Sequence, residues 1–444
     1  MRSRSGQLGS MGLAILFASA VPAQETPVFT FSKVDVSLLE QVELLDRKFD
    51  REGLVLLDEK LGEYVSRVGR AMLPTSAAPE RVKWEFRVLR DPMPNAFALS
   101  NGSIYVNTGL LSLLENEDQL ASVLAHEITH VTDRHSYLHF RSYRKKAAIA
   151  NVVSAAASYA PSGELWGAAV RVGASVVPIV MSAMINGYSR ELERNADVYS
   201  FNKLAEGAYD PREMPNVFRL LQRKDEVEVE KVYYNDHPKL EERVSYTTGL
   251  VATKAPKPVE ADVAAERKLR YQQLTESAVR EDIGLAILSN RPRTALARAR
   301  KLAAFNPKSA DNICALGEAY RALGPWTPEL TPQDLTGDAK KDAVKMKRKF
   351  TAEEERQTLL AKDAGQKIWR ENQKSSEESY KQALALDPNH PKTHRGLAQL
   401  LESSDRKAES LAAYRKYLEL QPNALDRQRV VDRIDSLKRS TGEK

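Results

Sequence analysis

Hydrophobic positions follow helical spacing near the start of the chain and then change to strand spacing. Residues 33–72 carry apolar side chains at intervals of three and four, which predicts helices. These apolar positions include Leu54, Leu56, Leu57, Leu61, Tyr64, Val65 and Val68. Residues 82–89 alternate between apolar and polar side chains, which predicts a half-buried strand. The extended segment Asn95–Leu99, the turn at residues 100–102 and a partner at residues 104–106 predict a hairpin.

The helical pattern returns after the predicted hairpin. A helix from about Ser112 leads into a second one, which runs from Glu117 to Asp133. The second helix has one apolar face, formed by Leu120, Val123, Leu124, Ile128 and Val131. Residues 147–186 are the most apolar part of the chain, but Arg171 and several glycines and prolines argue against a transmembrane helix. We expect buried helices there, with peripheral contact to a membrane as the alternative.

The C-terminal part of the chain repeats itself with a period of 34 residues. Residues 251–261, with Pro256 and Pro258, are typical of a linker, and helix-forming residues dominate beyond them. The period relates Tyr380 to Tyr414, Leu384 to Leu418, Leu386 to Leu420 and Pro388 to Pro422. This period is typical of tetratricopeptide repeats, in which antiparallel helix pairs stack into an α-solenoid. We therefore expect a repeat domain at residues 262–438, with an unrelated helical bundle as the alternative.

The N-terminus has the layout of a secretory signal peptide. Arg2 and Arg4 precede an apolar stretch, Met11–Ala20, and small residues offer a cleavage point after Ala23. The stretch is shorter than the roughly 20 apolar residues that span a bilayer. We therefore expect residues 1–23 to be a cleavable signal peptide that directs export.

Composition and charge are typical of a globular protein and argue against some functions. The 444 residues, 42% of them hydrophobic and 28% charged, are ordinary for a globular protein of two or three domains. The net charge of +6 is spread in mixed sign along the chain, which argues against a nucleic-acid partner. The single cysteine, Cys314, excludes an intramolecular disulfide, and its apolar neighbours favour a buried thiol over a nucleophile.

The second predicted helix carries the sequence His-Glu-x-x-His. His126 and His130 are four residues apart and therefore share one side of a helix, so both imidazoles can bind one metal ion. Glu127 is rotated by about 100° from His126, which directs its carboxylate past the ion toward a water molecule. The alternative is a pair of surface histidines beside a solvated glutamate.

A catalytic zinc site needs a third protein ligand, and the acidic residues downstream are the candidates. Glu193 and Asp197 are four residues apart and share a helix face with Arg190. One of the two carboxylates could bind the metal while the other accepts a hydrogen bond from a ligand imidazole. Spacing alone does not decide between them.

Several segments of the chain resemble the gluzincin metallopeptidases, the family of HtpX, BepA and the CAAX prenyl proteases. They are Asn95–Leu99, Gly109–Leu111, Leu124–Val131, Arg134-His135 and a match to Ser-Arg-x-x-Glu-x-x-Ala-Asp at residues 189–197. The resemblance covers residues 33–250 and continues into the repeats, which resemble those of the BepA-type periplasmic subgroup. It implies one zinc ion per chain, held by His126, His130 and Glu193, with Asp197 orienting one of the histidines.

The resemblance extends to a histidine-proline pair, which is matched by His237-Pro238 with Arg243 downstream. The chain departs from the family at Asn195, where relatives often have glutamate, but this position lies off the ligand face. His135 and His139 are expected to be structural, because the ligand set is complete without them.

The implied chemistry is hydrolysis of a peptide bond. Zinc acts as a Lewis acid, while Glu127 accepts a proton from water and passes it to the leaving amine. His237 is the candidate donor to the negatively charged transition state. The alternatives are that His237 is a fourth zinc ligand in a resting state, or that Tyr233 or Tyr234 is the donor.

The expected substrate contacts lie on an edge strand and at the start of the acidic helix. An edge strand at Asn95–Leu99 can pair with the backbone of an extended, unfolded chain whatever its sequence. The candidate substrate-binding residues are Asn95, Phe97, Ala98 and Arg190.

Taken together, these patterns predict a mainly α protein: a gluzincin metallopeptidase domain with a small β-sheet at residues 33–250, followed by the α-solenoid. The expected function is a periplasmic zinc endopeptidase, with chaperone activity as an extension, that acts on misfolded or assembly-stalled envelope proteins. The repeats would recruit substrates or protein partners. The rival hypothesis is a repeat scaffold or chaperone whose metal site is structural or rarely active.

Overall fold

The computed structural model describes residues 29–441 except 77, 151–187, 208, 223–239, 255 and 325–351, and gives only the backbone at residues 143–150 and 352–364. The predicted signal peptide, most of the apolar stretch at residues 147–186, and His237 with Tyr233 and Tyr234 lie outside the described residues. Among the described helices, none combines the length and the apolar character needed to cross a membrane.

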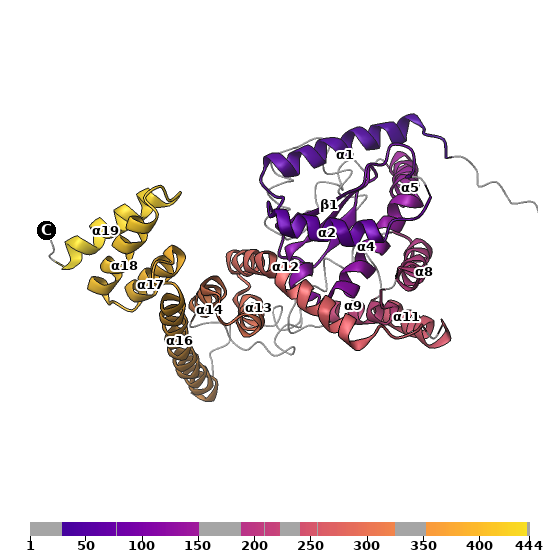
Figure 1. Ribbon diagram of the computed structural model, residues 1–444. Helices are drawn as coiled ribbons and strands as arrows, with labels where there is room; N and C mark the ends of the chain where they lie inside the picture. Colours follow the sequence, from indigo (N-terminus) through magenta and orange to yellow (C-terminus); the bar gives the residue numbers. More distant parts are fainter. Residues whose placement is uncertain are drawn as a thin grey trace, which may run out of the picture.

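A three-stranded sheet lies between helices in the N-terminal part (Figure 1). Its strands are β1 (Glu85–Leu89), β2 (Ala96–Ala98) and β3 (Ser103–Asn107), in the order β1-β3-β2. β1 runs parallel to β3, and β2 pairs antiparallel with β3 through the predicted hairpin. Gly102 has φ +100°, and an added Cβ would lie 2.6 Å from the Lys83 carbonyl oxygen, so the turn requires glycine.

Alternation along the strands gives the sheet two apolar faces, each covered by helices. Helix α1 (Lys33–Arg51) covers one face together with the start of α5 (His135–Ala150). Helices α2 (Glu59–Ala71) and α4 (Glu117–Thr132) cover the other. Tyr105 points toward α1, whereas its neighbours Ile104 and Val106 belong to the core around α4.

One predicted helical segment is extended instead. α1 begins with a reciprocal capping pair between Ser32 and Asp35, and Gly53, with φ +65°, follows its end. Residues 54–57 were included in the helical pattern, but they run antiparallel to β1, with Val55 opposite Leu89. Leu57 is 93% exposed. The helical prediction was wrong here because a segment that pairs with the edge of a strand can contain the same apolar residues as a helix.

The helix that carries the His-Glu-x-x-His sequence is buried almost along its whole length. A shorter helix, α3 (Thr108–Leu113), precedes α4 and begins four residues before the predicted start at Ser112. Asn116 caps α4 by accepting a hydrogen bond from the Gln119 backbone amide. Helices α8 (Arg190–Glu206), α9 (Met214–Leu221) and α11 (Leu240–Lys254) complete this part, with the short helix η1 (Pro211–Glu213).

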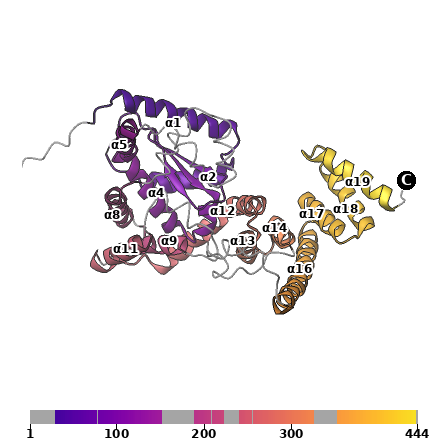
Figure 2. The ribbon, with the colours of Figure 1, turned by 180° about the vertical axis from the view of Figure 1, so that it is seen from behind.

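The C-terminal part consists of helices that pack successively on one another and extend to one side of the sheet (Figure 2). They are α12 (Ala261–Leu288), α13 (Pro292–Phe305), α14 (Ala310–Ala322), α16 (Ala352–Leu386), α17 (Pro391–Ser403), α18 (Lys407–Leu420) and α19 (Arg427–Thr441). Tyr380 and Tyr414, which the 34-residue period relates, are both buried. The assignment of these helices to tetratricopeptide repeats stays a prediction.

Helix α12 joins the two parts. It packs against α2, α3 and α4 and also against α13 and α14. Tyr271 of α12 lies in the core beside Tyr64, and its hydroxyl donates a 2.6 Å hydrogen bond to the Leu111 carbonyl oxygen. The expected linker at residues 251–261 and the domain boundaries around it stay predictions, but α11 extends to Lys254, so the linker's first residues are helical.

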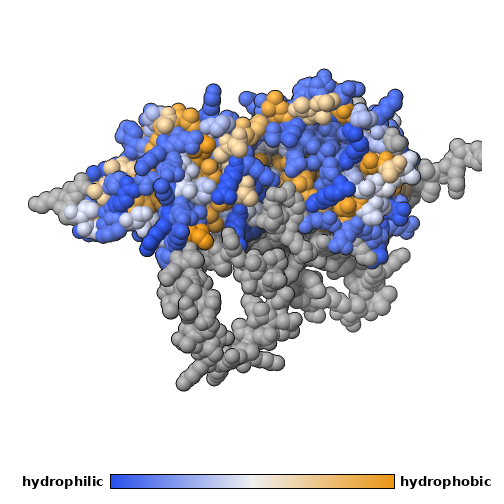
Figure 3. Space-filling model, turned by 90° about the horizontal axis from the view of Figure 1, so that it is seen from below, coloured by the Kyte–Doolittle hydropathy of each residue, from blue (hydrophilic) through white to orange (hydrophobic). Residues whose placement is uncertain are grey.

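Polar and apolar residues are mixed over the surface of both parts. Seen from below, the described residues show small hydrophobic areas interspersed with hydrophilic ones (Figure 3).

Candidate metal centre

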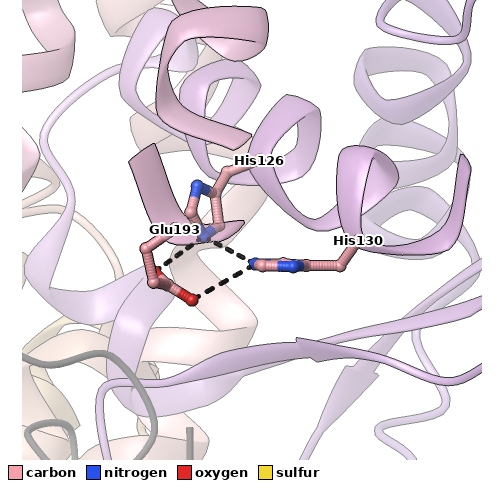
Figure 4. Close-up of side chains that lie close together, drawn as sticks. All are labelled: His126, His130 and Glu193. Atoms are coloured by element: carbon pink, nitrogen blue, oxygen red, sulfur yellow. Dashed lines mark hydrogen bonds and ion pairs between the residues drawn. The ribbon is translucent and has the colours of Figure 1, made fainter. Parts of the chain in front are cut away.

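Helix α4 brings two buried imidazoles to one point. His126 and His130 lie one turn apart, and their Nε2 atoms are 3.0 Å from each other (Figure 4). Both side chains are buried between the sheet and the surrounding helices. The face shared by residues four apart was predicted from spacing, and the structure places both rings on it.

Helix α8 supplies a carboxylate to the same point. Glu193 is buried, and its Oε2 lies 3.5 Å from Nε2 of His126, while its Oε1 lies 3.5 Å from Nε2 of His130. α8 begins immediately after Ser189, whose hydroxyl caps it, which places Glu193 in the first turn. A hydrogen bond of 2.9 Å from the Ser200 hydroxyl to the Ser122 carbonyl oxygen joins α8 to α4.

The spacing of these donor atoms fits a metal ion of the size of zinc. Zinc–ligand distances of roughly 2.0–2.2 Å in a tetrahedron place ligand atoms about 3.3 Å apart. The distances here are 3.0 and 3.5 Å, and among the described residues this is the one cluster whose ligand atoms all lie within 4.8 Å of one another. Two imidazole nitrogens and one carboxylate are the donors that zinc takes in hydrolases, with a further position open.

Asp197 lies on the other side of His126. Its Oδ1 is 2.8 Å from Nδ1 of His126, the ring nitrogen opposite the shared point, and its side chain is fully buried. Spacing left Glu193 and Asp197 as equal candidates for the ligand. In the structure only Glu193 faces both Nε2 atoms, whereas Asp197 is placed to orient a ring.

Arg243 of α11 connects both acidic residues, and spacing assigned it no role. Its Nε and Nη2 donate hydrogen bonds of 2.9 and 2.6 Å to the two oxygens of Asp197. Its Nη1 lies 3.2 Å from Oε2 of Glu193, and its guanidinium is 4.2 Å from the ring centroid of Phe218. The family likeness at residues 237–243 was the one sequence signal for it, because nothing in the local pattern marks a buried arginine.

These carboxylates make the centre attractive to positive charge. Burial and the charge of Arg243 lower the pKa of His126, but Asp197 and Glu193 outweigh both and raise that pKa to about 9. A site that favours a proton on a buried imidazole is also one in which a metal cation is electrostatically favourable.

Glu127 faces a small cavity beside the two histidines. The cavity has a volume of ≈ 20 Å³, enough for water, and its walls are mostly apolar. It is lined by Ala96, Leu110, Ser122, Val123, His126, Glu127, Asp197, Met214, Val217, Phe218, Leu221 and Arg243. Glu127 is buried and lines this space together with His126 and Asp197, so a water molecule in the cavity can reach its carboxylate.

The expected edge strand borders the same cavity. β2 is the last strand of the sheet, and no further strand pairs with it in the described part of the chain. Because Asn95 and Leu99 hydrogen-bond with β3, the backbone groups of Ala96 and Ala98 point away from β3. The strand was expected to be exposed, but both alanines are buried. Phe97 stacks on Tyr105 in the core, with ring centroids 5.2 Å apart.

The remaining predicted site residues are less central or lie elsewhere. Arg190 is exposed at the start of α8. His237 is outside the described residues. The ring of His139 lies 5.9 Å from that of Tyr188. His135, expected to be structural, has its Nδ1 2.8 Å from Nδ1 of His130.

Comparisons with known proteins agree with this geometry. Residues 59–250 match Peptidase family M48. The chain is 36% identical over 148 residues to "Mitochondrial metalloendopeptidase OMA1" of Schizosaccharomyces pombe, which covers 33% of this chain and 40% of that protein. It is 34% identical over 170 residues to the "Putative beta-barrel assembly-enhancing protease" of Vibrio cholerae, covering 38% of this chain and 34% of that protein.

A third relative extends the match. The "Beta-barrel assembly-enhancing protease" of Escherichia coli is 26% identical over 235 residues, 48% of this chain and 46% of that protein. The chain thus matches between a third and a half of the length of these relatives. The matched region runs from α2 into α11 and contains every residue of the metal centre. The chain therefore carries a peptidase family M48 domain, a metallopeptidase domain that spans residues 59–250.

Proposed function

We propose that the protein is a zinc-dependent endopeptidase in which His126, His130 and Glu193 hold one zinc ion per chain. The convergence of these three buried donors beside Glu127 is the observation that carries the proposal. The similarity to a metalloendopeptidase and two proteases supports it.

Each side chain around the metal position would have a separate role in the reaction. Zinc, when bound, supplies the Lewis acidity that polarises the scissile carbonyl and favours ionisation of water. Glu127 accepts the proton of the attacking water and returns it to the leaving amine. Asp197 holds the ring of His126 by a hydrogen bond at Nδ1, and Arg243 holds Asp197 in turn.

An extended substrate segment would pair with β2 along the side that faces away from β3. The backbone groups of Ala96 and Ala98 would pair with the substrate, which brings a scissile bond toward Glu127 at the adjoining cavity. Phe97 would contribute indirectly, because its buried ring anchors the strand on Tyr105. Asn95 would hold the start of β2 in place, since its carbonyl oxygen accepts a 2.9 Å hydrogen bond from the backbone amide of Asn107. Arg190, exposed near Glu193, would meet the chain as it leaves the site.

The substrate class we propose is misfolded or assembly-stalled envelope proteins in the periplasm. The N-terminal pattern of residues 1–23 and the two relatives named beta-barrel assembly-enhancing proteases support this compartment and class. The C-terminal helices would recruit substrates or protein partners. His237 remains our proposed donor to the transition state, with a fourth zinc ligand or a tyrosine donor as alternatives.

The test combines zinc content with cleavage of an unfolded protein. The purified protein is expected to contain about one zinc ion per chain and to cleave β-casein, and chelation should abolish cleavage. Glu127→Gln should keep the zinc and lower the cleavage rate by about 10²–10⁴-fold, because the metal ligands are unchanged while the base is lost. Glu191→Gln, an exposed acid on α8, is the matched control and should leave both unchanged.

The same variant separates the protease from the rival scaffold hypothesis. Crosslinking Glu127→Gln in cells should trap uncleaved envelope proteins. Zinc absent from the purified protein contradicts the zinc site. Full cellular function of Glu127→Gln with zinc bound contradicts proteolysis and favours a scaffold with a structural metal.

A further inference from the structure

His130 is contacted on two sides by side chains that the ligand set does not include. Its Nδ1 lies 2.8 Å from Nδ1 of His135, at the start of α5. Its ring stacks on Tyr188, with centroids 4.0 Å apart and planes inclined by 18°. The hydroxyls of Tyr188 and Ser136 are 2.8 Å apart, which ties the stacked ring to the same turn of α5. The ring of His130 is therefore held at one edge and on one face.

The chain turns sharply to bring His135 to this position. α4 ends at Thr132, and Arg134 adopts φ +57°, a left-handed conformation that is costly for a non-glycine residue. The turn reverses the exposure of neighbouring side chains: Asp133 is exposed, whereas His135 is only 2% exposed. A strained turn that buries a polar ring against another polar ring needs a compensating interaction, and the 2.8 Å contact is that interaction.

The proton positions follow from what the metal needs. To bind a metal, Nε2 of His130 must present its lone pair, so its proton must lie on Nδ1. That proton then points at Nδ1 of His135, 2.8 Å away, which must be an acceptor. The proton of neutral His135 consequently lies on Nε2, which faces the Asp133 carboxylate at 3.8 Å.

The two ligand histidines are therefore held by different kinds of acceptor. His126 has a buried carboxylate, Asp197, at its Nδ1, whereas His130 has a neutral imidazole. A carboxylate makes the ligand ring more basic, while a neutral acceptor orients the ring without adding charge. The centre already contains three buried acidic residues, Glu127, Glu193 and Asp197, so a neutral acceptor at His130 avoids adding another anion.

We infer that His135 is a positioning residue that fixes the orientation and tautomer of His130 for metal binding. The inference rests on the proposed zinc site and adds to it a residue outside the ligand set.

Two substitutions at His135 test its acceptor atom. His135→Asn can place an amide oxygen near the position of Nδ1 and so preserve the acceptor. His135→Leu removes the acceptor and leaves the Nδ1 proton of His130 buried without this hydrogen bond. His139→Asn, on the next turn of α5, is the matched control. Zinc affinity is measured on the full chain by competition with a chromogenic chelator, and the unfolding midpoint is recorded for each protein.

The expected result is an ordered series. His135→Leu should weaken zinc binding by about 10–100-fold, His135→Asn by clearly less, and His139→Asn should match the unmodified protein. Co²⁺ substitution gives a second readout, because a reoriented His130 shifts the visible absorption of the bound ion. These readouts report on ligand geometry, which a purely structural role of His135 would leave unchanged in any protein that remains folded.

Each contrary outcome is decisive. Equal zinc affinity of His135→Leu and the unmodified protein, with both folded, overturns the inference and leaves the zinc site intact. An equal loss in His135→Asn and His135→Leu assigns the effect to packing and also overturns it. Absence of zinc binding by the unmodified protein removes the proposed function and the inference together.

Discussion

The metal centre and the helices α16 to α18 hold their charges in opposite ways. Around the metal centre, Glu127, Glu193, Asp197 and Arg243 are each 4% exposed or less, and they contact residues from different helices. Along α16 to α18 many ion pairs join near neighbours on a single helix and are largely exposed. Examples are Glu377–Lys381, Arg406–Glu409 and Lys416–Glu419.

This difference decides where a single substitution matters. An exposed pair between helix neighbours contributes roughly 0–1 kcal/mol, because water solvates each charge after the other is removed. A buried group that loses its partner has no such replacement. The domain therefore depends on long-range contacts that must form together, whereas the C-terminal helices depend on apolar packing between successive helices.

The largest effect is expected for Arg243→Met, which removes the charge that faces two buried carboxylates. We expect the free energy of unfolding to fall by about 3–5 kcal/mol, because Asp197 remains buried without its bidentate partner. Zinc affinity should fall as well, since Asp197 orients His126. Urea unfolding and chelator competition measure the two effects.

The control for Arg243→Met is the same substitution at an exposed position. Arg194 lies on α8 with its guanidinium 5.4 Å from the ring centroid of Tyr246 on α11. Arg194→Met should change stability by less than about 1 kcal/mol. If the two variants unfold at the same urea concentration, the burial of Arg243 does not make its charge more important for stability than that of an exposed arginine.

Packing rather than charge should dominate in the C-terminal helices, and Gly317 tests this. A Cβ at Gly317 would lie 2.7 Å from the ring of Tyr380, which is fully buried and has no room to move. Gly317→Ala should therefore cost about 1–3 kcal/mol, although alanine favours a helix more than glycine does. Zinc affinity should be unchanged.

Gly284 provides the opposite case on α12. An added Cβ there meets no atom within 4 Å, so Gly284→Ala should stabilise the protein by about 0.5–1 kcal/mol. Thermal unfolding of both variants gives the comparison. A stabilising Gly317→Ala would show that α14 and α16 are not packed as described.

The amino-acid sequence predicted the two parts unequally. The 34-residue period and the His-Glu-x-x-His spacing are local, so they placed the C-terminal helices and the rings of His126 and His130 in advance. Spacing did not distinguish Glu193 from Asp197, because both lie on one face of α8. The two differ only in the ring nitrogen of His126 that each one faces, and the packing of α8 against α4 decides this.

Two further contacts had no local signal at all. Arg243 reaches Asp197 from 46 positions along the chain, and no pattern within α11 marks it as buried. His135 follows a left-handed residue, Arg134, and the direction of the chain after such a turn depends on tertiary packing. The helical prediction for residues 54–57 was wrong for the same reason, since apolar side chains there fit a helix face or a sheet edge equally well.

A smaller effect is expected where the two parts meet. Tyr271→Phe removes the hydroxyl that donates to the Leu111 carbonyl oxygen, and that oxygen remains buried. We expect a loss of about 1 kcal/mol in the free energy of unfolding. Tyr320→Phe, whose hydroxyl accepts exposed hydrogen bonds from Arg300, should change it by a few tenths of a kcal/mol at most. Equal losses would mean that the bond between α12 and α3 adds nothing to the junction.

The smallest effect concerns pH and lies within the C-terminal helices. Asp311 of α14 accepts a 3.1 Å hydrogen bond from Nε2 of His390, which caps α17. That hydrogen bond is the main cause of the lowered pKa of Asp311, and burial opposes it. A carboxyl whose folded-state pKa is depressed stabilises the protein above its unfolded-state value, near 3.8, and the contribution is lost as pH falls through the lower folded-state value.

Because the Asp311 side chain is half exposed, solvent screening reduces the expected contribution to about 0.5 kcal/mol or less. The protein contains many other acidic groups, so the informative quantity is the difference between the unmodified protein and Asp311→Asn. That difference in the free energy of unfolding should be present at pH 5 and should shrink as pH falls below about 3.8. A difference that grows in acid would reverse the sign of the Asp311 contribution, and the contact between α14 and α17 would then need another origin than this hydrogen bond.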